Sequence, residues 1–556
     1  MEAAGLVLGV IPVAIQGLNT YRDIVSSIKN ARRDLDCLLR DLKTEHQILQ
    51  NTCEILLKGI APDSVLDVMI EEPFGADWDA YNNEVHLRLW RSSTVFKERV
   101  EEMREAALDL QRKLAIDGDG KTRFSDRGTI LKEWKHNAHF SLNKKDYRDI
   151  LARLKDGNAV LNTLATQNSE LEPTRRSRSQ AKLAHIIRKL SQEVYAAFRN
   201  VLTCSCPHNL GLGMAAVSRK DVILPGTDGQ CAARTIPLDI MLESGGKTQR
   251  WNRLRVQLAD EKARPPMPPT AKSTASLSRS RSPKKTQYSS YLSASIQLSS
   301  ETLPSAITDL CHTLQKGKYK TSATSDCFGN ISCNSRRFNL YHQDCQPDHL
   351  SAISLSTILE IQGNGGDLKF NYTERLKLAL ALSYSVLHLY KTPWLAKTVT
   401  PQDIVFLKEQ QQASPNAASY LGRPFLAKTP PSSTSASQFQ STQAEGRPID
   451  LTILSLGLLL IQIMIGRQIS DLALTPDMHI KSTLSKKEIA SKYIASVMES
   501  GGMNYAGVVQ WCLGSILSVA CLDDEKFAQD FYNAVIMRLE GDLGLQSLMT
   551  VSGSET

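Results

Sequence analysis

Residues 21–58 carry the most regular apolar pattern in the chain. Apolar residues recur there at alternating steps of three and four, which places them in one stripe along a helix. The positions of the stripe are Ile24, Ile28, Ala31, Leu35, Leu38, Leu42, Leu49 and Leu56. Gly59 and Pro62 follow the stripe and end the predicted helix. A stripe that runs for about ten turns has to be buried against other helices, so this segment predicts a helical assembly.

Three further segments show the same helical spacing. They cover residues 96–114, 147–164 and 183–198, and the last of them follows the basic run at 175–178. The segments differ in length and are separated by modest connections, which favours antiparallel packing over a free coiled coil. The sequence therefore predicts a helical bundle over residues 1–200.

The pattern changes from residue 201 onward. Short β-like pieces appear at 209–214, 236–242 and 251–258, with Gly, Pro and Asp between them. Two more short strands are predicted near 327–333 and 338–341. We therefore expect a small β-containing lobe over residues 201–370.

The rest of the chain, residues 371–556, is predicted to be a mainly helical lobe. Two inserts have too few apolar residues to offset the entropy of ordering a chain. Residues 261–305 are rich in Pro, Ser, Lys and Arg and are predicted to be disordered, and residues 408–446 are rich in Gln, Ser and Pro and are predicted to be mobile. The fold class expected for the whole chain is mainly α with a smaller β part, α+β.

Charge and cysteine content bear on partners and location. The net charge is +8, from 66 Lys+Arg against 58 Asp+Glu, and two basic runs at 175–178 and 279–285 contribute to it. No aromatic-bearing groove accompanies these runs, so we interpret them as solvated linkers and do not expect nucleic-acid binding. The 11 cysteines are scattered without regular spacing, which favours a reducing intracellular compartment, the cytoplasm, with the nucleus as the alternative.

The first residues form an apolar segment at 3–15. A secretory signal would begin with basic residues, whereas this segment follows Glu2, and a membrane span needs about 20 apolar residues. This segment is shorter and contains Pro12. We interpret it as a buried first helix, and membrane contact through residues 3–15 is the alternative.

Cys204, Cys206 and His208 are the best metal-ligand candidates. Residues two apart on an extended strand point to the same side, so these three side chains could converge, with Cys231 as a possible fourth ligand. Structural zinc motifs more often place two residues between paired cysteines. The preferred interpretation is a strand edge with reduced thiols, and we assign no metal site and no cofactor.

Two segments resemble parts of the helical lobe of protein kinases. The first is Leu387-His388 followed by the stretch from Pro401 to Phe406, in the order of a helix, a catalytic loop and a strand. The second begins Ser455-Leu456-Gly457 and resembles the core helix of that lobe, with Gln462 and Gly466 at two further pattern positions. The resemblance implies a kinase-like two-lobed domain after the bundle.

The positions that carry kinase chemistry are replaced in this chain. With Pro401 as the reference for alignment, Thr398 stands at the catalytic aspartate, Thr400 at the adjacent lysine and Asp403 at the metal-binding asparagine. Phosphoryl transfer depends on such groups to orient the nucleophile and neutralise charge. The resemblance therefore implies a non-catalytic regulatory or scaffold protein that acts through protein partners, with no small-molecule ligand identified. Nucleotide sensing or residual kinase activity is an alternative.

The whole chain also resembles a group of uncharacterised filamentous-fungal proteins. The shared features are the Ala-Gly-Leu-Val-Leu-Gly-Val opening, the long helix with Gln-Asn-Thr-Cys-Glu-Ile-Leu-Leu at 50–57, the Cys-Ser-Cys piece at 204–206 and the Thr-Pro-Trp-Leu turn at 392–395. The opening helix is also similar to that of HeLo-type domains in fungal cell-death proteins. That similarity implies a second alternative, a membrane-active helical domain in cell-death signalling.

Overall fold

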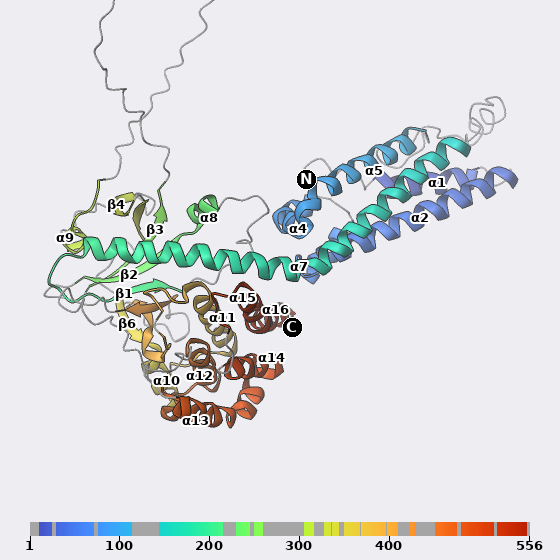
Figure 1. Ribbon diagram of the computed structural model, residues 1–556. Coiled ribbons are helices and arrows are strands. Elements are labelled where there is room, and N and C mark those ends of the chain that lie inside the picture. Colours follow the sequence, from blue (N-terminus) through green and yellow to red (C-terminus); the bar gives the residue numbers. More distant parts are fainter. Residues whose placement is uncertain are drawn as a thin grey trace, which may run out of the picture.

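A computed structural model defines the fold as two bodies that share one long helix, α7 (Lys144–Val201) (Figure 1). The described residues are 10–24, 29–71, 76–113, 144–214, 229–244, 250–259, 305–315, 327–334, 336–343, 350–366, 368–395, 397–409, 423–428, 451–474, 480–515 and 520–552. The chain is mainly α-helical with one antiparallel sheet, which confirms the expected α+β class. Residues 3–9 of the apolar opening, residues 261–304 and most of the insert at 408–446 lie outside the described residues.

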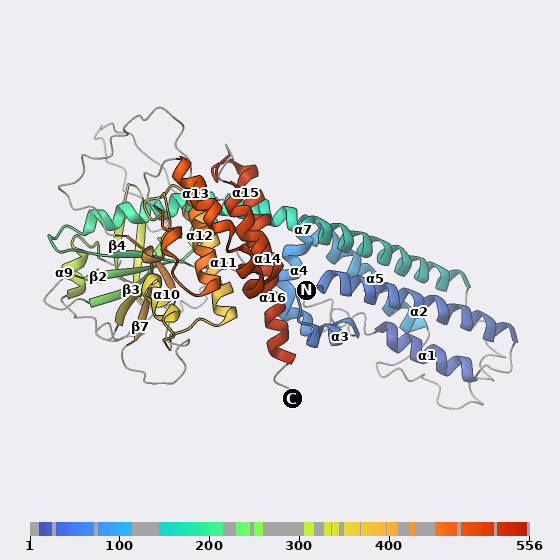
Figure 2. The same ribbon diagram turned by 90° about the horizontal axis from the view of Figure 1, so that it is seen from below.

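The first body is a helical bundle. Its long helices are α1 (Val10–Ile24), α2 (Lys29–Leu57), α5 (Ser93–Lys113) and the first half of α7, which lie side by side in both views (Figures 1 and 2). Between α2 and α5 the chain forms α3 (Asp63–Glu71), η1 (Ala76–Tyr81), α4 (Asn82–Leu89) and η2 (Trp90–Ser92). The part of the predicted stripe from Leu35 onward is buried on α2, where Leu42, Leu49 and Leu56 are fully inaccessible. The single helix predicted over residues 21–58 is wrong, because α1 ends at Ile24 and a separate helix, α2, begins at Lys29. Periodicity thus located the bundle core correctly.

Helix α7 corrects the prediction of two helices separated by a basic linker. It continues without a break for 58 residues, about 87 Å at 1.5 Å per residue, even though Pro173 lies inside it. Proline normally weakens a helix by removing one hydrogen bond. Here tertiary contacts hold both sides of it: Glu172 forms an ion pair with Arg88 at 2.6 Å, and Arg176 forms one with Glu540 at 3.5 Å. The basic run is therefore part of a helical junction in which Arg176 and Ser177 are buried and Arg178 is exposed.

The two hydrophobic cores divide within α7. Residues up to Ala165 belong to the bundle core, and residues from Leu183 onward belong to the core of the second body. The last part of the predicted bundle, after about residue 180, thus packs on the sheet and helices that follow it.

The second body contains an eight-stranded antiparallel sheet in the order β4-β5-β3-β2-β1-β8-β7-β6. The strands are β1 (Leu210–Gly213), β2 (Leu238–Ser244), β3 (Arg250–Leu258), β4 (Cys327–Cys333), β5 (Arg336–His342), β6 (Leu350–Ser354), β7 (Ile404–Glu409) and β8 (Pro424–Lys428). Alternate residues face the main core, as Leu238, Ile240 and Leu242 do on β2. The second half of α7 packs against this face.

Strand β8 corrects another prediction, because it lies within the insert expected to be mobile. Leu426 is buried in the main core, and Phe425 packs with Met241 and Leu407 on the other face of the sheet. Strand β8 pairs with β1 from Leu210↔Lys428 to Gly213↔Phe425. This ladder joins the strands of the expected small lobe to the β7–β8 hairpin in a single sheet. The kinase-like division into two lobes stays a prediction.

The helices of the second body pack beside and beneath the sheet (Figure 2). They are α8 (Gly229–Thr235), α9 (Leu310–Gln315), α10 (Leu355–Gly363), α11 (Tyr372–Leu389), α12 (Thr452–Ile465), α13 (Ile480–Ser491), α14 (Ile494–Gly514), α15 (Glu525–Phe531) and α16 (Met537–Ser552), with the turns η6 (Pro401–Asp403), η8 (Ser470–Leu472) and η10 (Tyr532–Ile536). Helix α12 is buried on all sides from residue 452 to residue 464, as expected for a core helix. Within the described part of the chain, no helix is long and apolar enough to cross a membrane.

Candidate functional site

The turn before β7 contains the three positions that align with kinase catalytic residues. Thr398 is buried at 4% exposure. Thr400 and Asp403 lie together in η6, where the Thr400 backbone N–H and hydroxyl both donate to Asp403 Oδ2, at 2.8 and 2.7 Å. Pro401 begins this turn with the backbone angle that such a turn requires. The carboxylate of Asp403 therefore caps its own turn.

The same turn is attached to the start of α12 through hydroxyl groups. Ser455 Oγ accepts a hydrogen bond from the Val399 backbone N–H at 3.0 Å, and Thr452 Oγ1 donates to the Lys397 carbonyl at 3.3 Å. Two hydroxyl groups of α12 thus hold the backbone of this turn.

The other two positions of the core-helix pattern also have structural roles. Gln462 accepts a hydrogen bond from the Ile469 backbone N–H at 3.0 Å, which fixes the chain after α12. Gly466 ends α12 at a φ of 77°, in the left-handed region that favours glycine. A Cβ at residue 466 would lie 2.6 Å from the flexible end of Gln362, which could move aside, so it is the backbone angle that favours glycine here.

The end of α11 is fixed against α7. Arg188 donates through Nη2 to the Leu387 carbonyl at 2.8 Å, and Trp394 Nε1–H donates to the Ser191 carbonyl at 2.8 Å. His388, the next residue after Leu387, is buried. Burial, together with the nearby Arg188 charge, lowers the pKa of His388 to about 3, so this imidazole is neutral at physiological pH.

A second group of chemically active side chains lies where α7 passes into β1. Cys204, Cys206 and His208 are in this connection, and Cys311 is at the start of α9. One ligand atom from each of the four residues lies within 4.8 Å of the others, so together they could hold a metal ion. Cys231, the fourth ligand considered from the sequence, is exposed on α8 and is not part of this group.

The thiols of this cluster differ in their acid–base behaviour. Burial alone would raise the pKa of Cys204, but its hydrogen-bond contacts with the His208 side chain and the Cys206 backbone outweigh burial and lower that pKa. Burial and the neighbouring Cys204 sulfur raise the pKa of Cys311 to about 12. Close packing of several sulfur atoms around one imidazole produces this contrast.

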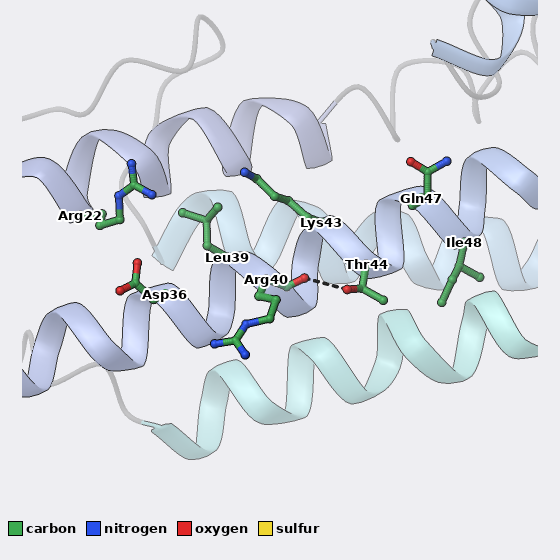
Figure 3. Close-up of a pocket in the computed structure, with 8 residues that line it drawn as sticks. All are labelled: Arg22, Asp36, Leu39, Arg40, Lys43, Thr44, Gln47 and Ile48. Atoms are coloured by element: carbon green, nitrogen blue, oxygen red, sulfur yellow. Dashed lines mark hydrogen bonds between the residues drawn. The ribbon is translucent and has the colours of Figure 1, made fainter.

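Two polar clefts lie elsewhere on the molecule. One, of about 580 Å³, is formed by α1 and α2 and lined by Arg22, Asp36, Arg40 and Lys43 among others (Figure 3). The Thr44 hydroxyl donates to the Arg40 carbonyl within it, at 2.9 Å. Its charged side chains lie along the rim of an open groove and do not converge on one point (Figure 3).

The other cleft, of about 480 Å³, lies on the sheet surface around Arg253, Arg255 and Arg423. Asp239 forms ion pairs with Arg255 at 3.5 Å and with Arg423 at 3.3 Å, so one carboxylate is shared by two of the three arginines. No sequence pattern predicts this cleft, because its residues come from β3, β5 and the segment before β8.

Fold and site together define the class of this protein: an α+β body with a hydroxyl-supported turn and a Cys/His cluster, extended by a helical bundle. The family model for a domain of unknown function, DUF7580, matches residues 181–545, and the chain belongs to this family. No curated protein and no solved structure shows significant similarity to the chain.

Proposed function

We propose that the protein is a non-catalytic regulatory or scaffold protein that acts through protein–protein contacts, with a C-terminal body similar to a protein kinase that has lost its catalytic groups. The observation that carries this proposal is the turn from Thr398 to Asp403. Its one carboxylate accepts two hydrogen bonds from Thr400, and Thr398 is buried. A general base has to reach the proton of its substrate, whereas this carboxylate is engaged in holding the backbone.

The support of the turn by Thr452 and Ser455 favours the kinase-like interpretation of the frame. Both residues lie on the helix that resembles the kinase core helix, and both contact the backbone at the expected loop. The whole-chain resemblance to uncharacterised filamentous-fungal proteins is consistent with such a frame being kept for a use other than phosphoryl transfer.

The shape of the molecule favours a scaffold. One continuous helix carries the bundle at one end and the α+β body at the other (Figure 1). Large apolar side chains are exposed on α14, where Met503 is 79% and Met498 is 49% exposed. Methionine side chains are common at surfaces that contact other proteins because they are flexible and polarisable. We therefore expect a partner with an apolar surface to contact α14.

The two alternative functions have less support. Membrane activity would require release of the opening helix, but Ile11, Ala14 and Leu18 of α1 are buried in the bundle core. Nucleotide binding in the kinase manner would require a cleft between two lobes, whereas β1 and β8 are hydrogen-bonded neighbours in one sheet. Liposome leakage and ATP-dependent thermal stabilisation test these alternatives directly.

The experiment for the proposal measures phosphate transfer from labelled ATP with magnesium by the full chain. We expect the wild type and the Asp403→Ala variant to give the same background signal. The variant should lose about 1 kcal/mol of stability, because its turn loses a cap. Transfer by the wild type that disappears in Asp403→Ala would contradict the proposal. Cross-linking in native cells should recover partner peptides joined to α14, and Met503→Ser should reduce their yield.

A further inference from the structure

The Cys/His cluster shows the supporting contacts of a built metal site. His208 is 7% exposed, and its Nδ1 lies 2.8 Å from the Glu243 backbone carbonyl. A carbonyl oxygen only accepts hydrogen bonds, so Nδ1 has to carry the proton. The other nitrogen, Nε2, then presents its lone pair to the cluster, where it lies 2.8 Å from Cys204 Sγ. Metal-binding histidines are oriented in the same way, by a carbonyl or carboxylate on the opposite ring nitrogen.

The group that orients His208 is itself fixed. The Glu243 backbone N–H donates to the Asn209 carbonyl at 2.9 Å, and Asn209 Nδ2 donates to Glu243 Oε2 at 2.5 Å. Both residues are at the pairing of β1 with β2, where the backbone is held by the sheet ladder. The imidazole therefore points at the cluster because the backbone at the end of the central β1–β2 pair holds it there.

Cys311 is presented from the other side by a capped helix. The His312 backbone N–H donates to Asp309 Oδ1 at 2.9 Å, which caps the start of α9. Gln315 Nε2 donates to Cys311 Sγ at 3.3 Å, a contact that would stabilise the thiolate of a metal-bound cysteine. Thus both halves of the cluster have a polar support outside the group of ligands itself.

The ligand types and their spacing select the ion. Three sulfurs and one imidazole nitrogen form the Cys₃His set of structural zinc sites. In a tetrahedron with Zn–S bonds of about 2.3 Å, neighbouring ligand atoms lie about 3.8 Å apart. The four atoms here lie within 4.8 Å of one another, so small side-chain rotations bring them onto one ion. Harder ions such as Mg²⁺ and Ca²⁺ prefer oxygen ligands and are not suited to this set.

We propose that Cys204, Cys206, His208 and Cys311 bind one structural Zn²⁺ ion. Four protein ligands fill the tetrahedron and leave no open position for water or substrate, which defines the site as structural. The ion ties the connection between α7 and β1 to α9. These two segments are distant in sequence, with β2, β3 and residues 260–304 between them. The zinc ion thereby ties the end of the shared helix to α9, whose Leu310 and Leu314 lie in the same core as the second half of α7.

The test is the zinc content of the full chain, purified under reducing conditions and transferred to chelator-treated buffer. Elemental analysis should find about one zinc per chain in the wild type. Cys311→Ser and Cys206→Ser should each lose most of it. Cys231→Ser is the matched control, because it removes an exposed cysteine outside the cluster and should keep the full content.

Cobalt substitution gives an independent measurement of the ligands. Co²⁺ bound to the wild type should show a thiolate-to-cobalt charge-transfer band, and Cys231→Ser should show the same band. Cys311→His keeps a ligand at the position, so it should retain zinc with a weaker band. This variant also keeps the test decisive if Cys311→Ser fails to fold.

Three results would overturn the proposal. They are a wild type without zinc after purification in zinc-containing medium, a zinc content that is unchanged in both Cys206→Ser and Cys311→Ser, and a disulfide that joins two of the three cysteines in protein alkylated at cell lysis. Peptide mapping without reduction detects the disulfide.

Discussion

The bundle and the α+β body use the two halves of α7 in different ways. In the bundle, α7 contributes an apolar stripe of Ile150, Leu154, Leu161 and Ala165 to a core made only of helices. In the body, the same helix adds directional contacts to its apolar face, such as the ion pair of Glu193 with Arg336 at 2.7 Å. Helix packing tolerates variation in detail, whereas hydrogen-bonded pairs require particular partners. The bundle is therefore specified mainly by pattern, with single directional pairs such as Asn158 with Glu45, whereas the body depends more on individual residues.

This contrast implies that the two cores respond separately to destabilising substitutions. Each core is a separate cluster of buried residues, so a cavity in one removes contacts only there. Within the described residues, the two cores are connected through α7 and the polar junction around Pro173. We expect two unfolding transitions that are coupled through this junction.

The largest expected effect comes from cavities in either core. Leu460→Ala on α12 and Leu154→Ala on α7 both remove fully buried side chains. Each should cost about 2–5 kcal/mol, Leu460→Ala in the transition of the body and Leu154→Ala in that of the bundle. Denaturant titration combined with hydrogen exchange assigns each loss to its body. Equal loss of protection in both bodies, from either variant, would show that the chain unfolds as one unit.

A substitution at the junction around Pro173 should have the next largest effect on stability. Arg88 is buried, and its Nη1 donates to the Leu56 and Lys58 carbonyls at 2.8 Å while Nε bonds Glu172 at 2.6 Å. It thus ends α2 and holds α7 beside Pro173. Arg88→Met keeps the apolar stem but leaves these acceptors without a charged donor, which should cost about 2–3 kcal/mol.

The readout for Arg88→Met is the separation between the two transitions. Because the residue joins α2, α4 and α7, its loss should lower the bundle transition and move it further from that of the body. Arg91→Met is the matched control, since Arg91 is exposed on the next turn of chain. A similar loss of stability in Arg88→Met and Arg91→Met would mean that the loss comes from removing a positive charge and not from the contacts of Arg88 at the junction.

The same contrast explains which elements of the fold could be predicted from the sequence and which could not. The stripe from Leu35 to Leu56 identified the bundle because a helical period is a local property of the chain. The strands at 210–213, 238–244 and 250–258 were also located closely, since turn residues separate them. Continuity of α7 through Pro173 was missed, because its support comes from Arg88 and Glu540, which are distant in sequence.

Three of the four residues in the Cys/His cluster could be identified from the sequence. Cys204, Cys206 and His208 follow one another at steps of two, which a strand-like connection brings to one side. Cys311 has no spacing relation to them, and its place beside them depends on how α9 packs against β2. Cys231 was the nearer cysteine in sequence, but α8 presents it to solvent. Three ligands were therefore readable from pattern, and the fourth required the tertiary fold.

The smallest expected effect is a pH dependence of stability that comes from His388, at the contact of α11 with α7. The pKa of His388 is lowered to about 3 by burial, with a further contribution from Arg188, against 6.5 for an ordinary histidine. Between these values the unfolded chain binds a proton that the folded chain does not. Stability from this residue is therefore complete above pH 6.5 and decreases as the pH falls. The loss should be about 1 kcal/mol from about pH 6.5 to about pH 5.5.

His388→Phe replaces the imidazole with a ring that does not titrate, next to Tyr384 at a ring distance of 5.4 Å. Carboxylates and other histidines respond equally in both proteins, so the difference between their stability–pH curves isolates His388. The curve of the variant should be flatter by about 1 kcal/mol over this interval, whereas His185→Gln, at an exposed position of α7, should leave the slope unchanged. Parallel curves for wild type and His388→Phe would mean that His388 takes up a proton in the folded protein, because α11 and α7 separate locally. The contact between Arg188 and the Leu387 carbonyl would then be the flexible part of the body.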